Sequence, residues 1–217
     1  MLSMPGKSVV ILISGSGSNL QAIIDASKTD ASINIVGVLS NRADAYGLQR
    51  ATDAQIPTAL IDHTLFSDRL SFDQAMMAQI DSWNPDLVVL AGFMRILTSE
   101  FVSHYEGRLI NIHPSLLPKF KGTQTHARAL EAGESEHGCT VHYVTEELDA
   151  GAPIIQAATP IVATDTVESL IEKVHKLEHQ IYPLAVSWIC SERLKSRDDG
   201  IALDDELLGP SGFRFIG

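Results

Sequence analysis

The sequence predicts an α/β fold built on a doubly wound, mostly parallel sheet. Short apolar runs alternate with segments of helical periodicity through the first half of the chain, which is typical of this class. Val9–Ile13 and Leu87–Ala91 are apolar throughout, as expected for strands covered on both faces. We expect one domain over 1–217, with a core of about 8–190 and a loosely packed tail at 191–217.

The elements of the first half follow from that alternation. Leu20, Ile23 and Ile24 recur at helical spacing after the first strand and its glycine-rich turn. After a frayed lead at 1–8, the expected elements are a strand at 9–13, a helix from about 20, a strand at 33–39, a helix at 45–55 and a strand at 58–61. A helix then runs from a Ser67 cap to Trp83, with Leu70, Gln74, Met77 and Ile80 on one face. A strand at 87–91 and a short helix from Thr98 or Ser99 follow.

In the second half of the chain, one more strand precedes a loop rich in proline and hydroxyl residues, and the regular alternation of strand and helix ends there. The segment Pro114–Thr125 contains two prolines and a glycine, and we expect a mobile loop there. A period near 3.6 from Val167 predicts a long amphipathic helix that Pro183 kinks or ends. The remaining elements are a strand at 109–112, a helix at 125–132 with Gly133 at its C-terminal end, and strands at 139–144 and 154–161 that add an antiparallel part.

The composition limits the kinds of partner. With 16 Lys and Arg against 27 Asp and Glu, the formal net charge is −11. An acidic surface repels nucleic acid and anionic membranes, although backbone N–H groups can still bind a small anion. Cys139 and Cys190 match no zinc or redox spacing, and the longest nearly apolar run, Leu87–Met94, is far shorter than a membrane span. We therefore expect a cytoplasmic protein with small-molecule partners and no metal.

The glycine loop Ser14–Asn19 joins the first strand to the first helix. Glycine lets the backbone approach a ligand and the helix N-terminus offers N–H groups, so a phosphate site is one interpretation. Leu20 stands where a dinucleotide fingerprint has its third glycine, and the lysine of a triphosphate loop is missing. An ordinary strand–helix turn explains the spacing equally well.

Asn111 and His113 lie two residues apart at the end of a predicted strand, so their side chains point to the same side. Open α/β sheets bind ligands at that end. An amide donor beside an imidazole suits acyl transfer, because one stabilises an oxyanion and the other handles charge. Asp149 would be a partner for the imidazole, although a solvated turn and a structural histidine are equally consistent with the residue types.

Four segments together resemble the phosphoribosylglycinamide formyltransferases, the folate-dependent enzymes of purine synthesis. They occur in the expected order, and the likeness covers about 9–188. The Asn-x-His-Pro-Ser-Leu-Leu-Pro motif is specific to folate-linked formyltransferases and hydrolases, and the glycine loop with Glu178 narrows the resemblance to this family. The segments are Gly15–Leu20, Ala91–Leu97, Asn111–Pro118 and Leu148–Gly151.

The resemblance implies a Rossmann-like formyltransferase fold, 10-formyltetrahydrofolate as donor and glycinamide ribonucleotide as acceptor. It implies that Asn111, His113 and Asp149 are catalytic. The implied ribonucleotide-binding residues are Gly17, Ser18, Asn19, His175, Lys176, Leu177 and Glu178. The implied folate-binding residues are Arg69, Met94, Arg95, Ile96, Leu97, Asn111, Thr145, Glu146, Glu147, Leu148 and Asp149. Without the resemblance, Arg69 reads as a surface charge and Glu178 as the partner of a nearby lysine.

The implied mechanism is direct attack of the acceptor amine on the formyl carbon, with no covalent enzyme intermediate. Asn111 and protonated His113 would stabilise the oxyanion. Asp149 would keep the imidazole cationic and, through a water, help to carry a proton from the amine to the leaving nitrogen. Two substrates held together would also gain from proximity.

Four alternatives differ in recognisable features. A 10-formyltetrahydrofolate hydrolase shares the three residues but would carry a regulatory domain before the core, and a methionyl-tRNA formyltransferase would carry a basic extension after it. A zinc hydrolase could use His175 and His179, but no glutamate follows the first histidine. A nucleotide-binding module would need only the glycine loop. The oligomeric state, monomer or homodimer, stays open.

Overall fold

The computed structural model describes residues 6–197 and 199–216. The chain divides into two units, Met1–Ile110 and Asn111–Gly217. That the chain forms one domain stays a prediction. The expected frayed lead falls mainly on residues 1–5, outside the described residues, whereas Lys7 and Ser8 already belong to the first strand.

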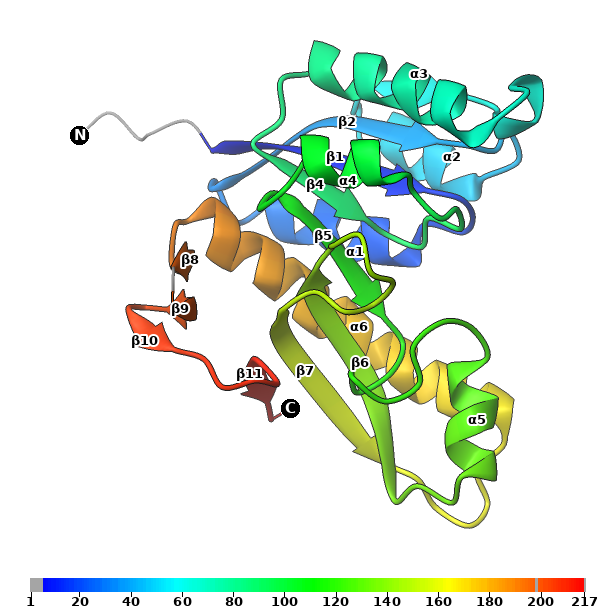
Figure 1. Ribbon diagram of the computed structural model, residues 1–217, viewed down its shortest axis with the longest axis vertical. Helices are drawn as coiled ribbons and strands as arrows, with labels where there is room; N and C mark the ends of the chain where they lie inside the picture. The colour runs from blue at the N-terminus through cyan, green and yellow to red at the C-terminus, as the bar shows by residue number, and fades with distance from the viewer. Residues whose placement is uncertain (1–5, 198, 217) are drawn as a thin grey trace. The chain divides into compact units, whose positions relative to one another are not determined.

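The first unit has four strands in the order β3-β2-β1-β4. Each neighbouring pair is parallel, so the predicted parallel, doubly wound pattern is confirmed here. Figure 1 shows α1 and α3 on opposite sides of these strands. The elements are β1 (Lys7–Ile13), α1 (Ser18–Ser27), β2 (Ile33–Ser40), α2 (Tyr46–Asp53), β3 (Thr58–Leu60), the 3₁₀ turn η1 (His63–Leu65), α3 (Arg69–Ser82), β4 (Leu87–Leu90) and α4 (Ser99–His104).

The core of this unit explains why the two apolar runs became central strands. Val9 to Ile13 have no exposed surface, and Leu87 to Val89 are equally buried. Each such side chain contributes about 1.5–3 kcal/mol by leaving water. Helices on both faces supply that burial, so no polar alternation is needed in the strand sequence.

Helix α3 departs from the prediction at its start and on its inner face. Asp68, not Ser67, is the N-cap, and its carboxylate accepts the Ser71 amide hydrogen at 2.8 Å. The expected Leu70 is 43% exposed and Gln74 is also exposed, whereas Met77 and Ile80 are buried as expected. The packed stripe begins at Phe72, because the helix starts one residue later and its inner face follows the spacing 72, 76 and 80.

The second unit contains the strand order β5-β6-β7-β11. Strands β6 and β7 are antiparallel, which confirms the predicted antiparallel part, and β11 pairs with β7 in parallel. Helix α6 packs against β6 and β7, as Figure 1 shows. The elements are β5 (Leu109–His113), α5 (Thr125–Glu131), β6 (Glu136–Tyr143), β7 (Pro153–Pro160), α6 (Val167–Cys190) and β11 (Phe213–Phe215).

Helix α6 continues through Pro183, so of the two predicted effects, a kink or an end, the end is wrong and the kink stays a prediction. An interior proline costs roughly 3 kcal/mol because it removes a hydrogen bond and crowds the preceding turn. Ile181 and Tyr182 before the proline, and Ala185 and Val186 after it, have no exposed surface. Burial on both sides of Pro183 offsets the local cost.

Over its described residues, the tail after Cys190 contains short strands that the sequence did not predict, and its loose packing stays a prediction. Strands β8 (Leu194–Arg197), β9 (Gly200–Leu203) and β10 (Glu206–Leu207) form a small antiparallel sheet. Its buried side chains are Leu194, Ile201, Ala202 and Leu203. The apolar residues are too few and too short in run to stand out in a polar sequence. Over the residues described, no helix is long and apolar enough to cross a bilayer.

Candidate active site

The glycine loop of the first unit presents an uncapped helix N-terminus. Gly17 is the N-cap of α1, with a φ of 71°, and no side chain caps the first turn. No acidic residue lies in that turn either, so its N–H groups and the helix dipole favour an anion. Ser18 and Asn19 are the first two residues of the helix. The geometry fits the phosphate interpretation better than that of a turn closed by a serine cap.

Close packing fixes the shape of this loop. A β-carbon on Gly17 would lie 2.6 Å from the α-carbon of Gly47, so glycine is required there on steric as well as conformational grounds. The Gly47 amide donates to the Gly15 carbonyl at 3.0 Å, and the Arg50 guanidinium donates to the Ser16 carbonyl at 2.8 Å. Helix α2 therefore holds the glycine loop from its side.

The predicted folate residues of the first unit lie at its surface. Arg69 is the first residue of α3 and is exposed. Met94 is 78% exposed and Ile96 is 60% exposed, which is unusual for large apolar side chains and typical of a binding surface. Arg95 is exposed as well, and Leu97 is partly buried.

A buried carboxylate anchors the end of that segment. Asp73 has no exposed surface, and its Oδ2 accepts from both the amide and the hydroxyl of Thr98 at 2.7 and 2.8 Å. Burial raises the pKa of Asp73, while these hydrogen bonds and the charges of Arg69 and Arg95 act in the opposite direction. The two predicted folate-binding arginines therefore lie near one carboxylate, a link that sequence reasoning missed.

The second unit brings the three predicted catalytic residues together. Asp149 Oδ2 lies 3.4 Å from His113 Nδ1, and both side chains are almost fully buried. Asp149 has a φ of 49°, a left-handed conformation that aspartate tolerates better than most residues. The same Oδ2 accepts the Gly122 amide hydrogen at 2.9 Å. Asp149 therefore holds both the imidazole and the loop that follows it.

Both nitrogens of His113 face hydrogen-bond acceptors. Nδ1 lies near the Asp149 carboxylate, and Nε2 lies 2.9 Å from the carbonyl oxygen of Phe120. A carbonyl oxygen only accepts, so Nε2 carries a hydrogen. Each ring nitrogen of His113 therefore has an acceptor within reach, which fixes the orientation of the ring.

A second histidine, His142, joins the centre, and sequence reasoning missed it. Its Nδ1 lies 2.8 Å from the Tyr143 carbonyl, and its Nε2 lies 3.4 Å from Asn111 Nδ2. Burial lowers the pKa of His142, so the neutral ring donates through Nδ1 and accepts from Asn111 through Nε2. This contact turns the Asn111 amide nitrogen toward the centre. The available signal was a histidine near the end of β6, the strand next to β5.

The remaining predicted residues of the second unit form two exposed groups and one buried acid. Thr145, Glu146, Glu147 and Leu148 are exposed ahead of Asp149, and Lys121 pairs with Glu147 at 2.9 Å. His175 and Lys176 are exposed on α6, Leu177 is partly buried, and Glu178 is 5% exposed. Lys173, which the residue types suggested as a partner of Glu178, pairs instead with Asp165 at 2.6 Å.

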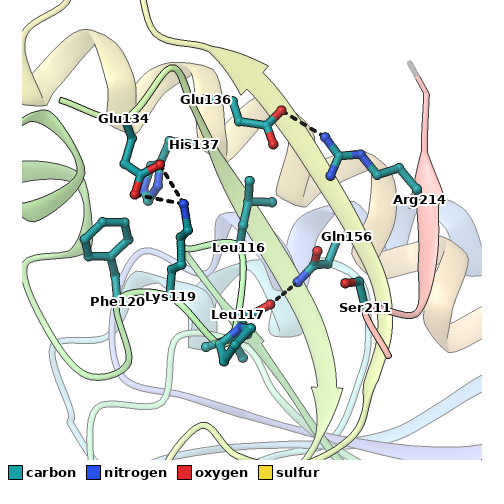
Figure 2. A pocket seen from close by; sticks show the side chains of 11 residues that line it. Leu116, Leu117, Lys119, Phe120, Glu134, Glu136, His137, Gln156, Ser211 and Arg214 are labelled. Atoms are coloured by element: carbon teal, nitrogen blue, oxygen red, sulfur yellow. Dashed lines mark hydrogen bonds and ion pairs between the residues drawn. The ribbon is translucent and has the colours of Figure 1, made fainter. Parts of the chain in front are cut away.

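The loop after β5 is tied down at several points, and its mobility stays a prediction. Thr125 donates to the Pro114 carbonyl and Ser115 to the Lys119 carbonyl, each at 2.6 Å. Figure 2 shows a pocket on the back of this loop, where Gln156 donates to the Leu117 carbonyl at 2.8 Å. The pocket includes Phe120 but none of the three predicted catalytic residues. Its ion pairs, Lys119 with Glu134 and Arg214 with Glu136, hold the loop and the chain end against β6.

The zinc alternative gains no support from the described residues. The rings of His175 and His179 stack with their centroids 6.3 Å apart. Within 6–197 and 199–216, no group of three or more histidine, cysteine or acidic side chains is arranged to hold a metal ion.

Comparison with known proteins gives a consistent result. The profile of the formyl transferase family matches residues 7–186. The chain is 52% identical over 206 residues to phosphoribosylglycinamide formyltransferase of Escherichia coli, covering 94% of this chain and 97% of that one. It is 46% identical over 193 residues to the human trifunctional purine biosynthetic protein adenosine-3, covering 88% of this chain and 19% of that longer protein.

Solved structures agree. Phosphoribosylglycinamide formyltransferase of Coxiella burnetii superposes with a TM-score of 0.93 at 53% identity, covering 97% of this chain and all of that one. Glycinamide ribonucleotide transformylase 1 of Symbiobacterium toebii gives a TM-score of 0.88 at 39% identity, covering 93% and 95% of the two chains. The predicted formyltransferase type of fold is confirmed.

Proposed function

The chain belongs to the phosphoribosylglycinamide formyltransferases within the formyl transferase family, and from that premise we propose how its residues carry the reaction. It transfers a formyl group to the amine of phosphoribosylglycinamide in purine biosynthesis. Membership implies a folate co-substrate, and the donor in our proposal is 10-formyltetrahydrofolate. The oligomeric state and the cytoplasmic location stay predictions.

In this proposal, each part of the substrates is assigned to residues whose chemistry suits it. The turn at Gly17, Ser18 and Asn19 takes the ribonucleotide phosphate, supported by a helix end with no side-chain cap and no acidic residue in its first turn. His175 to Glu178 serve the ribose and amine end, where the buried Glu178 carboxylate suits an amine. The folate residues that lie at the surface are Arg69, Met94, Arg95, Ile96, Thr145, Glu146, Glu147 and Leu148, and Leu97 beside them is partly buried.

The chemical step begins with attack of the amine nitrogen on the formyl carbon. A carbon–nitrogen bond forms and the formyl oxygen becomes an oxyanion, which Asn111 Nδ2 and the His113 cation stabilise. The formyl oxygen replaces the Phe120 carbonyl as the acceptor of the Nε2 hydrogen. A proton passes from the attacking nitrogen through water, assisted by Asp149, to the leaving nitrogen of the folate. The oxyanion then collapses, the old carbon–nitrogen bond breaks, and tetrahydrofolate leaves.

One observation carries this mechanism. His113 lies between the Asp149 carboxylate and a carbonyl oxygen, so its ring is held in place by an acceptor at each nitrogen before substrate arrives. A fixed positive charge costs no reorganisation when the oxyanion forms. The neutral His142 on the other side orients Asn111 without adding a second cation.

The decisive assay follows the release of tetrahydrofolate from 10-formyltetrahydrofolate by absorbance, with and without phosphoribosylglycinamide. We expect release to depend on the acceptor, and equal release without it would establish a hydrolase instead. His113→Ala should lower kcat by about 10²–10⁴-fold, the usual range for a positioned acid–base group. His104→Ala, at an exposed histidine on α4, is the matched control and should keep wild-type kcat. Full activity in His113→Ala would overturn the mechanism.

A further inference from the structure

Three strand ends of the first unit meet at one buried hydroxyl. Ser14 follows β1, Asn41 follows β2, and the segment 91–97 follows β4, the three strands being parallel neighbours. The carboxyl ends of such strands lie on the same edge of a sheet. Ser14 and Asn41 are 6% and 2% exposed.

The Ser14 hydroxyl accepts one hydrogen bond and donates another. The Met94 amide donates to Ser14 Oγ at 2.8 Å, and Ser14 Oγ donates to Asn41 Oδ1 at 2.6 Å. Asn41 Nδ2 lies 3.2 Å from His63 Nδ1, which also lies 3.0 Å from the Asn41 carbonyl oxygen, so His63 contacts both the side chain and the backbone of Asn41. The Ser14 hydroxyl accepts from Met94 and donates to Asn41, so its orientation is fixed.

The two loops that meet at Ser14 differ in how much they depend on it. The glycine loop has its own contacts, from Gly47 to Gly15 and from Arg50 to Ser16. Among the residues that the structure describes, the bond to Ser14 is the one hydrogen bond made by the backbone of 92–97, and the next anchor is Thr98 on Asp73. Losing the Ser14 hydroxyl would therefore release the segment that carries Met94 and Ile96.

We propose that Ser14 is a positioning residue that sets the folate-binding segment 92–97 through the chain Met94–Ser14–Asn41–His63. This inference rests on the proposed function, because it takes 92–97 as folate-binding. Ser14 touches neither substrate in this account. It fixes the backbone at Met94 and so presents the exposed side chains of the segment in one arrangement, which lowers the entropy lost when the folate binds.

Ser14→Ala tests the proposal, with Ser27→Ala as the matched control. The Ser27 hydroxyl donates to the Ile24 carbonyl at the end of α1 in the same unit. We expect Ser14→Ala to raise KM for the folate about tenfold, since an unpaired amide and amide oxygen remain, while KM for the ribonucleotide and kcat change less than about twofold. Ser27→Ala should leave all three constants unchanged. Asn41→Ala, which keeps the Met94–Ser14 bond, should give a smaller rise in KM for the folate.

A binding measurement tests this inference independently of the proposed function. Titration calorimetry with tetrahydrofolate measures folate affinity without turnover, and we expect it to fall about tenfold in Ser14→Ala. An equal loss for both substrates, or no loss for either, would overturn the positioning role. If Ser14→Ala folds poorly by thermal melting, the Asn41→Ala titration decides the same point. A wild-type protein that binds tetrahydrofolate but transfers no formyl group would contradict the proposed function and leave the role of Ser14 intact.

Discussion

At the scale of single residues, the proposed centre contains two histidines in different surroundings. His113 is flanked by a carboxylate and a carbonyl, whereas His142 is buried and neutral. The Asp149 carboxylate lies close to both rings, with Oδ2 3.4 Å from His113 Nδ1 and Oδ1 3.9 Å from His142 Nε2.

His142→Ala tests the role of His142 in orienting Asn111. We expect kcat to fall about tenfold with little change in either KM, since the Asn111 amide stays present but loses its orientation. Asn111→Ala should cost about 10²–10³-fold, as for other single oxyanion donors. The double variant should then be no slower than Asn111→Ala, which steady-state kinetics on all four proteins would measure. Fully multiplicative losses would mean that His142 acts independently of Asn111.

That Asn111 and His113 lie together could be predicted from the sequence, whereas their surroundings could not. Asn111 and His113 share a strand, so their common orientation follows from the period of two. Asp149 is a turn residue far along the chain, and the family resemblance supplied that pairing. The roles of His142 and of the Phe120 carbonyl depend on how β6 and the loop lie beside β5, which no local pattern encodes.

At the scale of elements, the glycine loop and α2 are fitted to each other. Gly17→Ala should lower the free energy of unfolding by about 1–2 kcal/mol, because the new β-carbon meets Gly47 and the φ of 71° is unfavourable. It should also raise KM for the ribonucleotide at least about tenfold by shifting the first turn of α1.

Gly15→Ala is the stability control for that prediction. A β-carbon there would meet nothing within 4 Å, so urea unfolding should give a value close to wild type. Similar losses in both variants would mean that the loop is sensitive to any side chain, and that the contact with Gly47 is not the cause.

Strand β11 is a short element whose Phe213 contacts helix α6. The ring of Phe213 packs edge to face on Trp188 at 5.3 Å between centroids. Phe213→Ala should lower the free energy of unfolding by about 1–2 kcal/mol, combining the aromatic pair with lost burial. Ile216→Ala, at a side chain that is 89% exposed, should leave the free energy of unfolding unchanged. Thermal melts of both variants would measure the difference. An equally small change in both variants would mean that β11 adds little to stability.

The sequence predicted the strands better than the ends of the helices and the tail. Apolar runs such as Leu87–Leu90 mark buried strands directly. The inner face of α3 and the passage of α6 through Pro183 were decided by packing, which outweighed local signals of capping and of proline. The tail sheet rests on a few buried residues among charges, so its composition resembled a loop.

At the scale of the whole molecule, the net charge is negative, whereas some local groups of the first unit are positive. The net charge of −11 opposes an anionic ribonucleotide at long range. The helix end at Gly17 and the exposed arginines of the first unit supply local positive potential instead. In the proposed site, affinity for the phosphate would therefore depend on short-range geometry, where salt screens least.

Buried histidines should make the free energy of unfolding depend on pH below neutrality. Burial lowers the pKa of His126 from its ordinary 6.5 to about 4, with further contributions from the charges of His137, His175 and His113. Burial also lowers the pKa of His137. The unfolded chain binds protons at these histidines before the folded chain does, so the free energy of unfolding should fall as the pH drops from about 6.5 toward 4. Urea titrations across that range would measure the slope. His126→Gln should flatten it, because glutamine takes up no proton in either state, and an unchanged slope would place the acid sensitivity elsewhere in the molecule.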